Sequence, residues 1–149
     1  MLFRSVDNSN KKDEVFVRAK FLFTPSKNFS LLGTVISSDF KNGYDVWAPD
    51  NNDQFLTYSD SEGEDSQNTN AGSLNLHYQL PNNFFIKAIS SFSATKQVHS
   101  YDGDWANDEY WLDQHGFDSN IEGWSYSFYD SNRRKRNNFS QEIRLSNQQ

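Results

Sequence analysis

The chain has 149 residues, with 20 acidic and 14 basic side chains, a formal net charge of −6 and no cysteine. An acidic chain is poorly suited to nucleic acid, whose recognition needs cationic surface that displaces counterions. The lack of cysteine excludes disulfides, thiolate zinc sites and a cysteine nucleophile. No segment approaches the roughly 18 to 20 apolar residues of a transmembrane helix, and residues 1–12 lack the apolar centre of a signal peptide.

Aromatic residues are abundant, with 13 Phe, 7 Tyr and 4 Trp, whereas aliphatic residues are few and Asn, Asp and Ser are common. Aromatic side chains favour strands, but little material is left for a core packed from two sides. This balance predicts strands with one apolar side and one wet side. A membrane-spanning strand therefore stays compatible with the composition.

The first strand is expected at residues 13–24, where apolar residues alternate with a second set that carries Arg18 and Lys20. Alternation of this kind places successive side chains on opposite faces of a strand. A short turn at 25–28 begins with proline, and the Val, Ile, Phe and Thr content of 29–38 predicts the second strand.

Residues 73–80 give the clearest alternation, since Leu74, Leu76, Tyr78 and Leu80 interleave with polar residues. A short turn at 81–83 leads to a fourth strand at 84–95, and the fifth is expected at 138–146. Between these strands lie two long polar loops, 39–72 and 100–137, with eight acidic residues each.

Loops of more than 30 residues are unusual in compact soluble domains, whereas outer-membrane β-barrels combine short periplasmic turns with long external loops. The predicted fold is therefore all-β, with antiparallel up-and-down strands, about five consecutive strands of a larger transmembrane β-barrel. Closed bacterial barrels use even strand numbers from eight upward, so we expect the chain to be part of a larger protein. Polar strand residues would then face a watery lumen: Arg18, Lys20, Asn75, His77, Glu142 and Arg144.

Four segments resemble the barrel domain of TonB-dependent outer-membrane receptors. DEVFVRAKFLFTPSKNFSL at 13–31 is similar to one hairpin of that family, and SLNLHYQLPNNFFIKAISSFS at 73–93 is similar to the next. NNFSQEIRLSN at 137–147 resembles the family's "FSQE(L/I)RL" strand, and YDGDWANDEYW at 101–111 resembles the external loop that often precedes it.

This resemblance implies an active importer of the bacterial cell outer membrane, energised through TonB, that takes up iron-siderophore complexes, vitamin B12 or oligosaccharides. Its implied partners are outer-membrane lipid and lipopolysaccharide, an N-terminal plug domain, the TonB complex and a small-molecule ligand. The chain departs from the family pattern because it has no signal peptide, TonB box, plug domain or terminal aromatic residue. No cofactor and no nucleic-acid partner are implied.

Aromatic residues of the long loops are the candidate ligand contacts, because such rings stack on sugars and on aromatic ligands. Membrane-interface girdles and loop packing are the alternatives. The candidates are Trp47, Trp105, Tyr110, Trp111 and Trp124.

Two other clusters have competing interpretations. Asp102, Asp104, Asp108 and Glu109 could bind calcium, but their spacing differs from the twelve-residue calcium loop and a solvated outer loop explains them as well. The basic run at 133–136 resembles a nucleic-acid patch, but next to a membrane strand it fits anionic headgroups better.

A soluble all-β module that binds carbohydrate or another ligand is the alternative function. In such a sandwich the apolar strand residues would be buried against a second sheet, whereas in a barrel they would be exposed in the isolated chain. An enzyme is a more distant third hypothesis, since the sequence has no nucleophile elbow, phosphate loop or metal-binding histidine pair.

Overall fold

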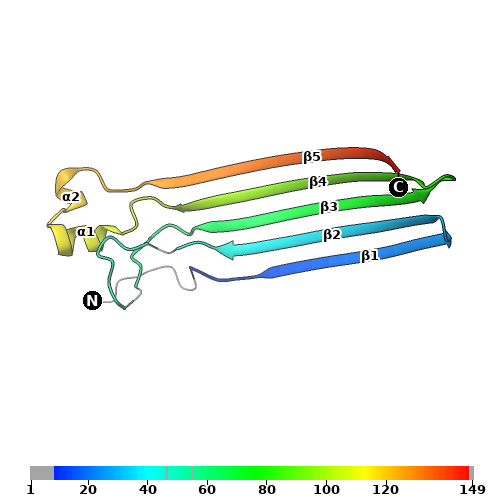
Figure 1. Cartoon of the computed structure of the whole chain (residues 1–149). Helices are drawn as coiled ribbons and strands as arrows, with labels where there is room; N and C mark the ends of the chain where they lie inside the picture. Colours follow the sequence, from blue (N-terminus) through cyan, green and yellow to red (C-terminus); the bar gives the residue numbers. More distant parts are fainter. Residues whose placement is uncertain (1–8, 46, 55, 148–149) are drawn as a thin grey trace. The chain divides into compact units, whose positions relative to one another are not determined.

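The structure is a computed structural model that describes residues 9–45, 47–54 and 56–147. Residues 1–8 and 148–149 lie outside the described part. The expectation that residues 1–12 do not form a signal peptide therefore falls mostly outside it. Five strands form one sheet in chain order (Figure 1): β1 (Glu14–Ser26), β2 (Phe29–Gly43), β3 (Glu64–Gln79), β4 (Phe84–Asp102) and β5 (Tyr129–Asn147). The prediction of an all-β, antiparallel, up-and-down fold is confirmed.

Four predicted boundaries are wrong, because the strands continue well into the segments expected to be loops. β2 extends to Gly43 and β4 to Asp102, while β3 begins at Glu64 and β5 at Tyr129. The loops expected at 39–72 and 100–137 therefore shorten to 44–63 and 103–128. The strand residues added by this extension are mostly polar and show no regular alternation. Their strand conformation therefore depends on pairing with a neighbouring strand.

Two short helices interrupt the connection between β4 and β5: α1 (Asp108–His115) and α2 (Ser119–Glu122). The side chain of Asn107 caps α1 by accepting a hydrogen bond from the Tyr110 amide at 2.9 Å, and Gly116 ends it with a φ of 65°. Within the described residues, no helix has the length and apolar character needed to cross a membrane.

The chain divides into two compact units. We call residues 1–14, 40–66 and 97–133 the loop unit, and residues 15–39, 67–96 and 134–149 the sheet unit. Segments 40–66 and 97–133 carry 15 acidic and 2 basic side chains, a formal charge of −13, whereas the sheet unit carries 2 acidic and 9 basic ones, a formal charge of +7. The charges of the chain are thus segregated by unit.

Buried hydrophobic side chains occur only in the loop unit, as far as the described residues go: Tyr58, Ala106 and Tyr110. The sheet unit instead exposes most of its large apolar side chains. Among the described residues, the sheet unit is a single layer of strands, which explains this difference.

Pairing between strands determines which residues of the sheet unit share a face. Phe29 contacts both Phe23 of β1 and Tyr78 of β3, and the Phe92 ring of β4 lies against Gly72 of β3. Ser91 and Ser140 are hydrogen-bonded on the other face. By alternation, one face carries most of the large apolar residues and is called the apolar face. Its opposite is richer in polar residues, although it also holds Phe16, Leu22, Leu32 and Phe85, and is called the wet face. Prominent members of the apolar face are Val17, Phe21, Phe23, Phe29, Val35, Leu74, Leu76, Tyr78, Phe84, Phe92, Phe139, Ile143 and Leu145.

Candidate functional site

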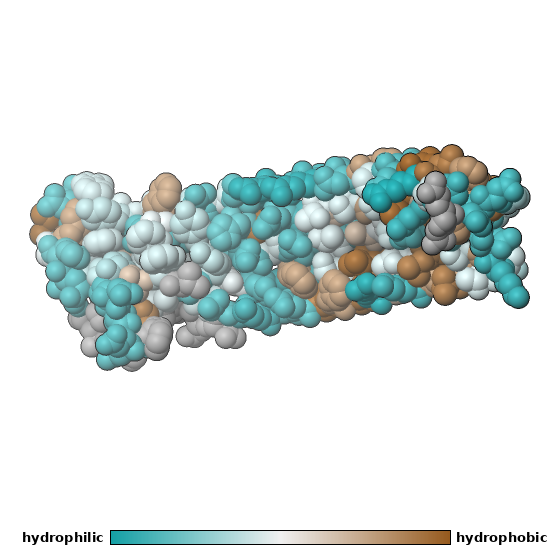
Figure 2. Space-filling model, in the orientation of Figure 1, coloured by the Kyte–Doolittle hydropathy of each residue, from teal (hydrophilic) through white to brown (hydrophobic). Residues whose placement is uncertain are grey.

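The apolar face of the sheet unit is the first candidate site. Phe21 is 53% exposed, Leu74 48% and Ile143 69%, and the described chain forms no second sheet that could cover them. Figure 2 shows brown, hydrophobic surface gathered over strands of this unit. Monomeric soluble proteins seldom expose a continuous apolar surface of this kind, and where one occurs it marks contact with a membrane or a partner.

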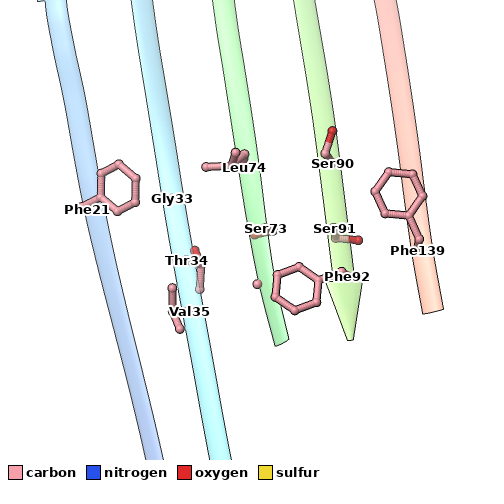
Figure 3. Close-up of a pocket in the computed structure, with 11 residues that line it drawn as sticks. Phe21, Gly33, Thr34, Val35, Ser73, Leu74, Ser90, Ser91, Phe92 and Phe139 are labelled. Atoms are coloured by element: carbon pink, nitrogen blue, oxygen red, sulfur yellow. The ribbon is translucent and has the colours of Figure 1, made fainter. Parts of the chain in front are cut away.

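A shallow groove of about 330 Å³ runs across this face, and glycines create it. A Cβ atom on Gly33 would collide with the ring of Phe21, and one on Gly72 would lie 2.8 Å from Cε1 of Phe92. In Figure 3 the Phe21 ring points from β1 toward Gly33 on β2, while Phe92 and Phe139 each point toward the preceding strand. Rings that lie flat over strand glycines give the face a smooth aromatic surface.

An aromatic row borders the apolar face beside the two short turns. Phe23 and Phe29 make an edge-on contact at 6.4 Å, and Phe29 makes another with Tyr78 at 6.2 Å. Phe84 follows the second turn on the same face. Rows of aromatic side chains of this kind flank the apolar band of membrane barrels at the water interface.

Hydrogen-bonded polar pairs border the apolar face on its other side. Ser37 donates to Asn70 at 3.0 Å, and Asn68 donates to Asp39 at 3.2 Å. From Phe84 to Phe92 the apolar stretch of β4 covers about 27 Å along the strand at about 3.4 Å per residue. A strand tilted by about 40° would cover about 20 Å of membrane thickness, which is close to the apolar band of about 25 Å in barrels.

Small polar side chains dominate the wet face. Ser91 and Ser140 are hydrogen-bonded at 2.7 Å, Asn138 donates to Ser93 at 3.2 Å, and Thr69 bonds with Thr95 at 3.1 Å. These bonds cross β3, β4 and β5 and line the face with hydroxyl groups.

All six residues expected in a lumen lie on this wet face, by alternation from the contacts above: Arg18, Lys20, Asn75, His77, Glu142 and Arg144. Glu142 forms an ion pair with Arg144 on its own strand. His77 packs against the ring of Phe85 at 5.5 Å. The wet face is strongly cationic, but its role as a lumen wall stays a prediction.

Tyr110 lies in the core of the loop unit, so its predicted role as an exposed ligand contact is wrong. Its side chain is 4% exposed and packs against Tyr58 with ring centroids 4.6 Å apart. The Tyr58 hydroxyl donates to Asp50 at 2.7 Å, and this bond, with burial, raises the pKa of Tyr58 to about 12. The two long connections fold onto each other here, which places an apparent loop residue in a core.

The four tryptophans all belong to the loop unit and form two groups. Trp47 and Trp105 stack at 5.9 Å and are 58% and 40% exposed. Trp111 and Trp124 instead pack on Tyr126, at 4.6 and 4.9 Å. Trp105 also holds a φ of 61°, a left-handed backbone conformation that a bulky residue seldom adopts. The stacked pair and Trp124, which is 53% exposed, are therefore the accessible tryptophan surfaces of this unit.

Asp102 fixes one connection of the loop unit to the end of β4. Its carboxyl is 3% exposed, and its Oδ2 atom accepts the backbone N–H groups of Asp60 at 3.0 Å and Ser61 at 3.4 Å. Burial, followed by a hydrogen bond with the carboxyl of Asp104, raises the pKa of Asp102 to about 7. The nearby carboxyl of Asp104 adds to the effect of burial, because a second negative charge beside Asp102 disfavours its ionised form.

The structure does not support the calcium interpretation of this region. Within the described ranges, no group of three or more His, Cys, Asp or Glu side chains is arranged to hold a metal ion. Asp102 and Asp104 are close together, but Asp108 accepts a hydrogen bond from Ser119 at 3.0 Å.

Sequence reasoning missed three residues of the loop unit: Tyr58, Phe117 and Tyr126. Phe117 and Tyr126 form the ring cluster with Trp111 and Trp124. The sequence could have predicted helix α1, since Asn107 and Gly116 are typical capping residues for its N-terminal and C-terminal ends. No sequence pattern predicts the contact between Tyr58 and Tyr110, because the two residues come from different connections.

Comparison with known proteins adds no relative, since no protein-family model, no curated protein and no solved structure matches the chain. The resemblance to TonB-dependent receptors stays a prediction.

Proposed function

We propose that this chain contributes five consecutive strands and two external connections to an outer-membrane receptor of the TonB-dependent kind. The observation that carries the proposal is the uncovered apolar face, bordered by an aromatic row on one side and by polar pairs on the other. In water this face would be a liability, whereas in a bilayer it meets hydrocarbon. The hydroxyl-rich, cationic wet face would then line the interior.

The unpaired backbone of the two edge strands also supports a place in a closed membrane barrel. β1 and β5 each have one neighbour in the sheet, so that each leaves one edge unpaired. Inside a bilayer every backbone polar group needs a partner, and only a closed barrel provides one for strands. The sheet would therefore continue into further strands on both sides.

The loop unit is the part of the chain that we propose to contact the ligand. The stacked Trp47–Trp105 pair offers a flat, exposed surface, and rings of this kind capture sugars and aromatic ligands. In the proposed function these connections meet the ligand outside the cell, the wet face packs against a plug domain, and TonB supplies energy for uptake. An iron-siderophore complex or a similarly scarce nutrient is the proposed cargo.

The exposure of the apolar strand residues argues against the soluble binding module. In a sandwich, Val15, Phe21, Leu74 and Leu145 would be buried against a second sheet, yet all four are exposed. None of the described strands packs over them.

Substitution on the two faces tests the membrane assignment. Leu74→Arg places a charge on the apolar face, whereas Asn75→Arg places the same charge one residue away on the wet face. Arginine on the lipid side of a barrel destabilises insertion by about 2 to 4 kcal/mol near the midplane. The full chain carrying Leu74→Arg should therefore bind phosphatidylcholine vesicles at least about thirtyfold more weakly in a flotation assay.

Asn75→Arg is the matched control for the vesicle-binding assay. Asn75→Arg should bind the vesicles about as well as the unmodified chain. Equal loss in both variants, or no vesicle binding by the unmodified chain, would overturn the proposal.

A further inference from the structure

We propose that Lys96 and Lys135 form a binding site for the phosphate of an anionic lipid headgroup, on the apolar face of the sheet unit. The inference rests on the proposed function, because it needs this face to meet a bilayer. It adds a specific lipid contact that membrane insertion alone does not require.

The register of β4 and β5 brings the two lysines together. Ser91 bonds with Ser140, and Ser93 with Asn138, so each step forward on β4 is matched by one step back on β5. The bond from the Tyr101 hydroxyl to Asp130 follows the same register further along. Lys96 therefore lies directly opposite Lys135, and directly opposite residues have Cβ atoms about 4.5 to 5.5 Å apart.

Two like charges in this arrangement destabilise the sheet unless an anion joins them. Both lysines are exposed, and no ion pair joins either of them to another side chain in the described part of the chain. The carboxylate in the same row, Asp39, accepts a hydrogen bond from Asn68. It lies on β2, two strands from Lys96, which corresponds to about 10 Å.

The position of the pair favours a lipid over a free phosphate ion. Phe92 and Phe139 face each other in the same register, four residues closer to the short turns on each strand. Four residues correspond to about 13 Å along a strand, or about 10 Å along the normal of a tilted one. Because lysine stems lie along apolar surface while the ammonium reaches polar groups, the pair can meet phosphates just outside the hydrocarbon. Acyl chains of the same lipid could then contact the two phenylalanines.

Vesicle binding by the full chain tests the site. Binding to phosphatidylcholine vesicles is compared with binding to vesicles that contain about one fifth phosphatidylglycerol, whose headgroup bears a phosphate. The unmodified chain should prefer the anionic vesicles, and Lys96→Gln with Lys135→Gln should reduce that preference up to about thirtyfold, since each lysine near an anionic surface contributes about fivefold. Arg18→Gln with Lys20→Gln removes the same charge from the wet face and should keep most of the preference.

Each outcome has a distinct meaning. No binding to either vesicle would overturn the proposed function together with this inference. Binding to phosphatidylcholine without a preference, or equal loss in the two double variants, would overturn the lysine site alone. Binding of inorganic phosphate in the absence of vesicles, lost in Lys96→Gln with Lys135→Gln, together with no preference for the anionic vesicles, would assign the site to free phosphate instead.

Discussion

The buried carboxyl of Asp102 makes the loop unit sensitive to pH. Folding raises its pKa from the ordinary 3.8 to about 7, so the folded state binds a proton more tightly than the unfolded state. Stabilisation from this proton is complete below the unfolded value of 3.8 and is lost as pH rises through about 7. Asp102 lies in the loop unit, outside the apolar stretch of β4.

We therefore expect the loop unit to lose stability between pH 6 and pH 8, because the ionised carboxylate is buried beside Asp104. The backbone amides of Asp60 and Ser61, which donate to Asp102, should then lose protection as the unit opens. Hydrogen exchange, corrected for the intrinsic pH dependence, measures this loss. Asp102→Asn resembles the protonated acid and should keep both amides protected at pH 8, with a gain in stability of about 1 to 2 kcal/mol. Asp113→Asn on the exposed side of α1 is the control; a gain of the same size there would show that burial of the Asp102 carboxyl is not the cause.

Trp105 gives a second prediction, at its backbone. Its φ of 61° is unfavourable for any residue with a Cβ atom, by about 1 kcal/mol relative to glycine. Trp105→Gly and Trp105→Ala both lose the stack on Trp47, but only the glycine variant relieves the backbone. Urea unfolding should find Trp105→Gly more stable than Trp105→Ala by about 1 kcal/mol. Equal stability would show that the surrounding loop relaxes around residue 105.

Among the elements, the turn between β3 and β4 depends on two asparagines. Asn82 and Asn83 hold φ values of 63° and 61°, and the Leu80 amide donates to the Phe84 carbonyl at 2.8 Å across the turn. Asparagine tolerates this conformation better than most residues, and glycine accepts it without strain. Asn83→Gly should therefore raise the stability of the sheet unit by about 0.5 to 1 kcal/mol, and Asn83→Ala should lower it by about 1 kcal/mol.

Thermal unfolding of the chain in detergent micelles measures both changes. Lys27, in the other short turn, supplies a control, since Lys27→Ala alters a turn residue without a positive φ. A higher melting temperature for the alanine than for the glycine variant of Asn83 would contradict the assigned turn geometry.

The strands show which parts of the fold could be predicted from the sequence. The alternation of Leu74, Leu76 and Tyr78 located the second half of β3, because one face of that half is apolar. Residues 64–72 lack alternation, since both sides of that part carry polar side chains, and the strand there depends on β2 and β4. The same reason hid the first half of β5. For the candidate site, alternation places Arg18 and His77 on one face, whereas the burial of Tyr110 depends on Tyr58 in another connection and has no sequence pattern.

For the whole molecule, the segregation of charge predicts a response to salt. Segments 40–66 and 97–133 hold 15 acidic side chains against 2 basic ones, so their mutual repulsion opposes the folded loop unit. Raising the ionic strength shortens the range of this repulsion to about 8 Å at physiological salt. Scanning calorimetry should therefore find that sodium chloride raises the melting temperature of the loop unit by a few degrees; a fall would show that repulsion among these carboxylates does not control the stability of the unit.

The four tryptophans all lie in the loop unit, and the sheet unit contains none. Indole emission from the unmodified chain thus reports on one unit only, without any dye or engineered label. The far-ultraviolet ellipticity comes mainly from the strands, most of whose residues belong to the sheet unit. Recording both signals from one cuvette during a temperature ramp would reveal whether the two units melt as a single cooperative body or in sequence.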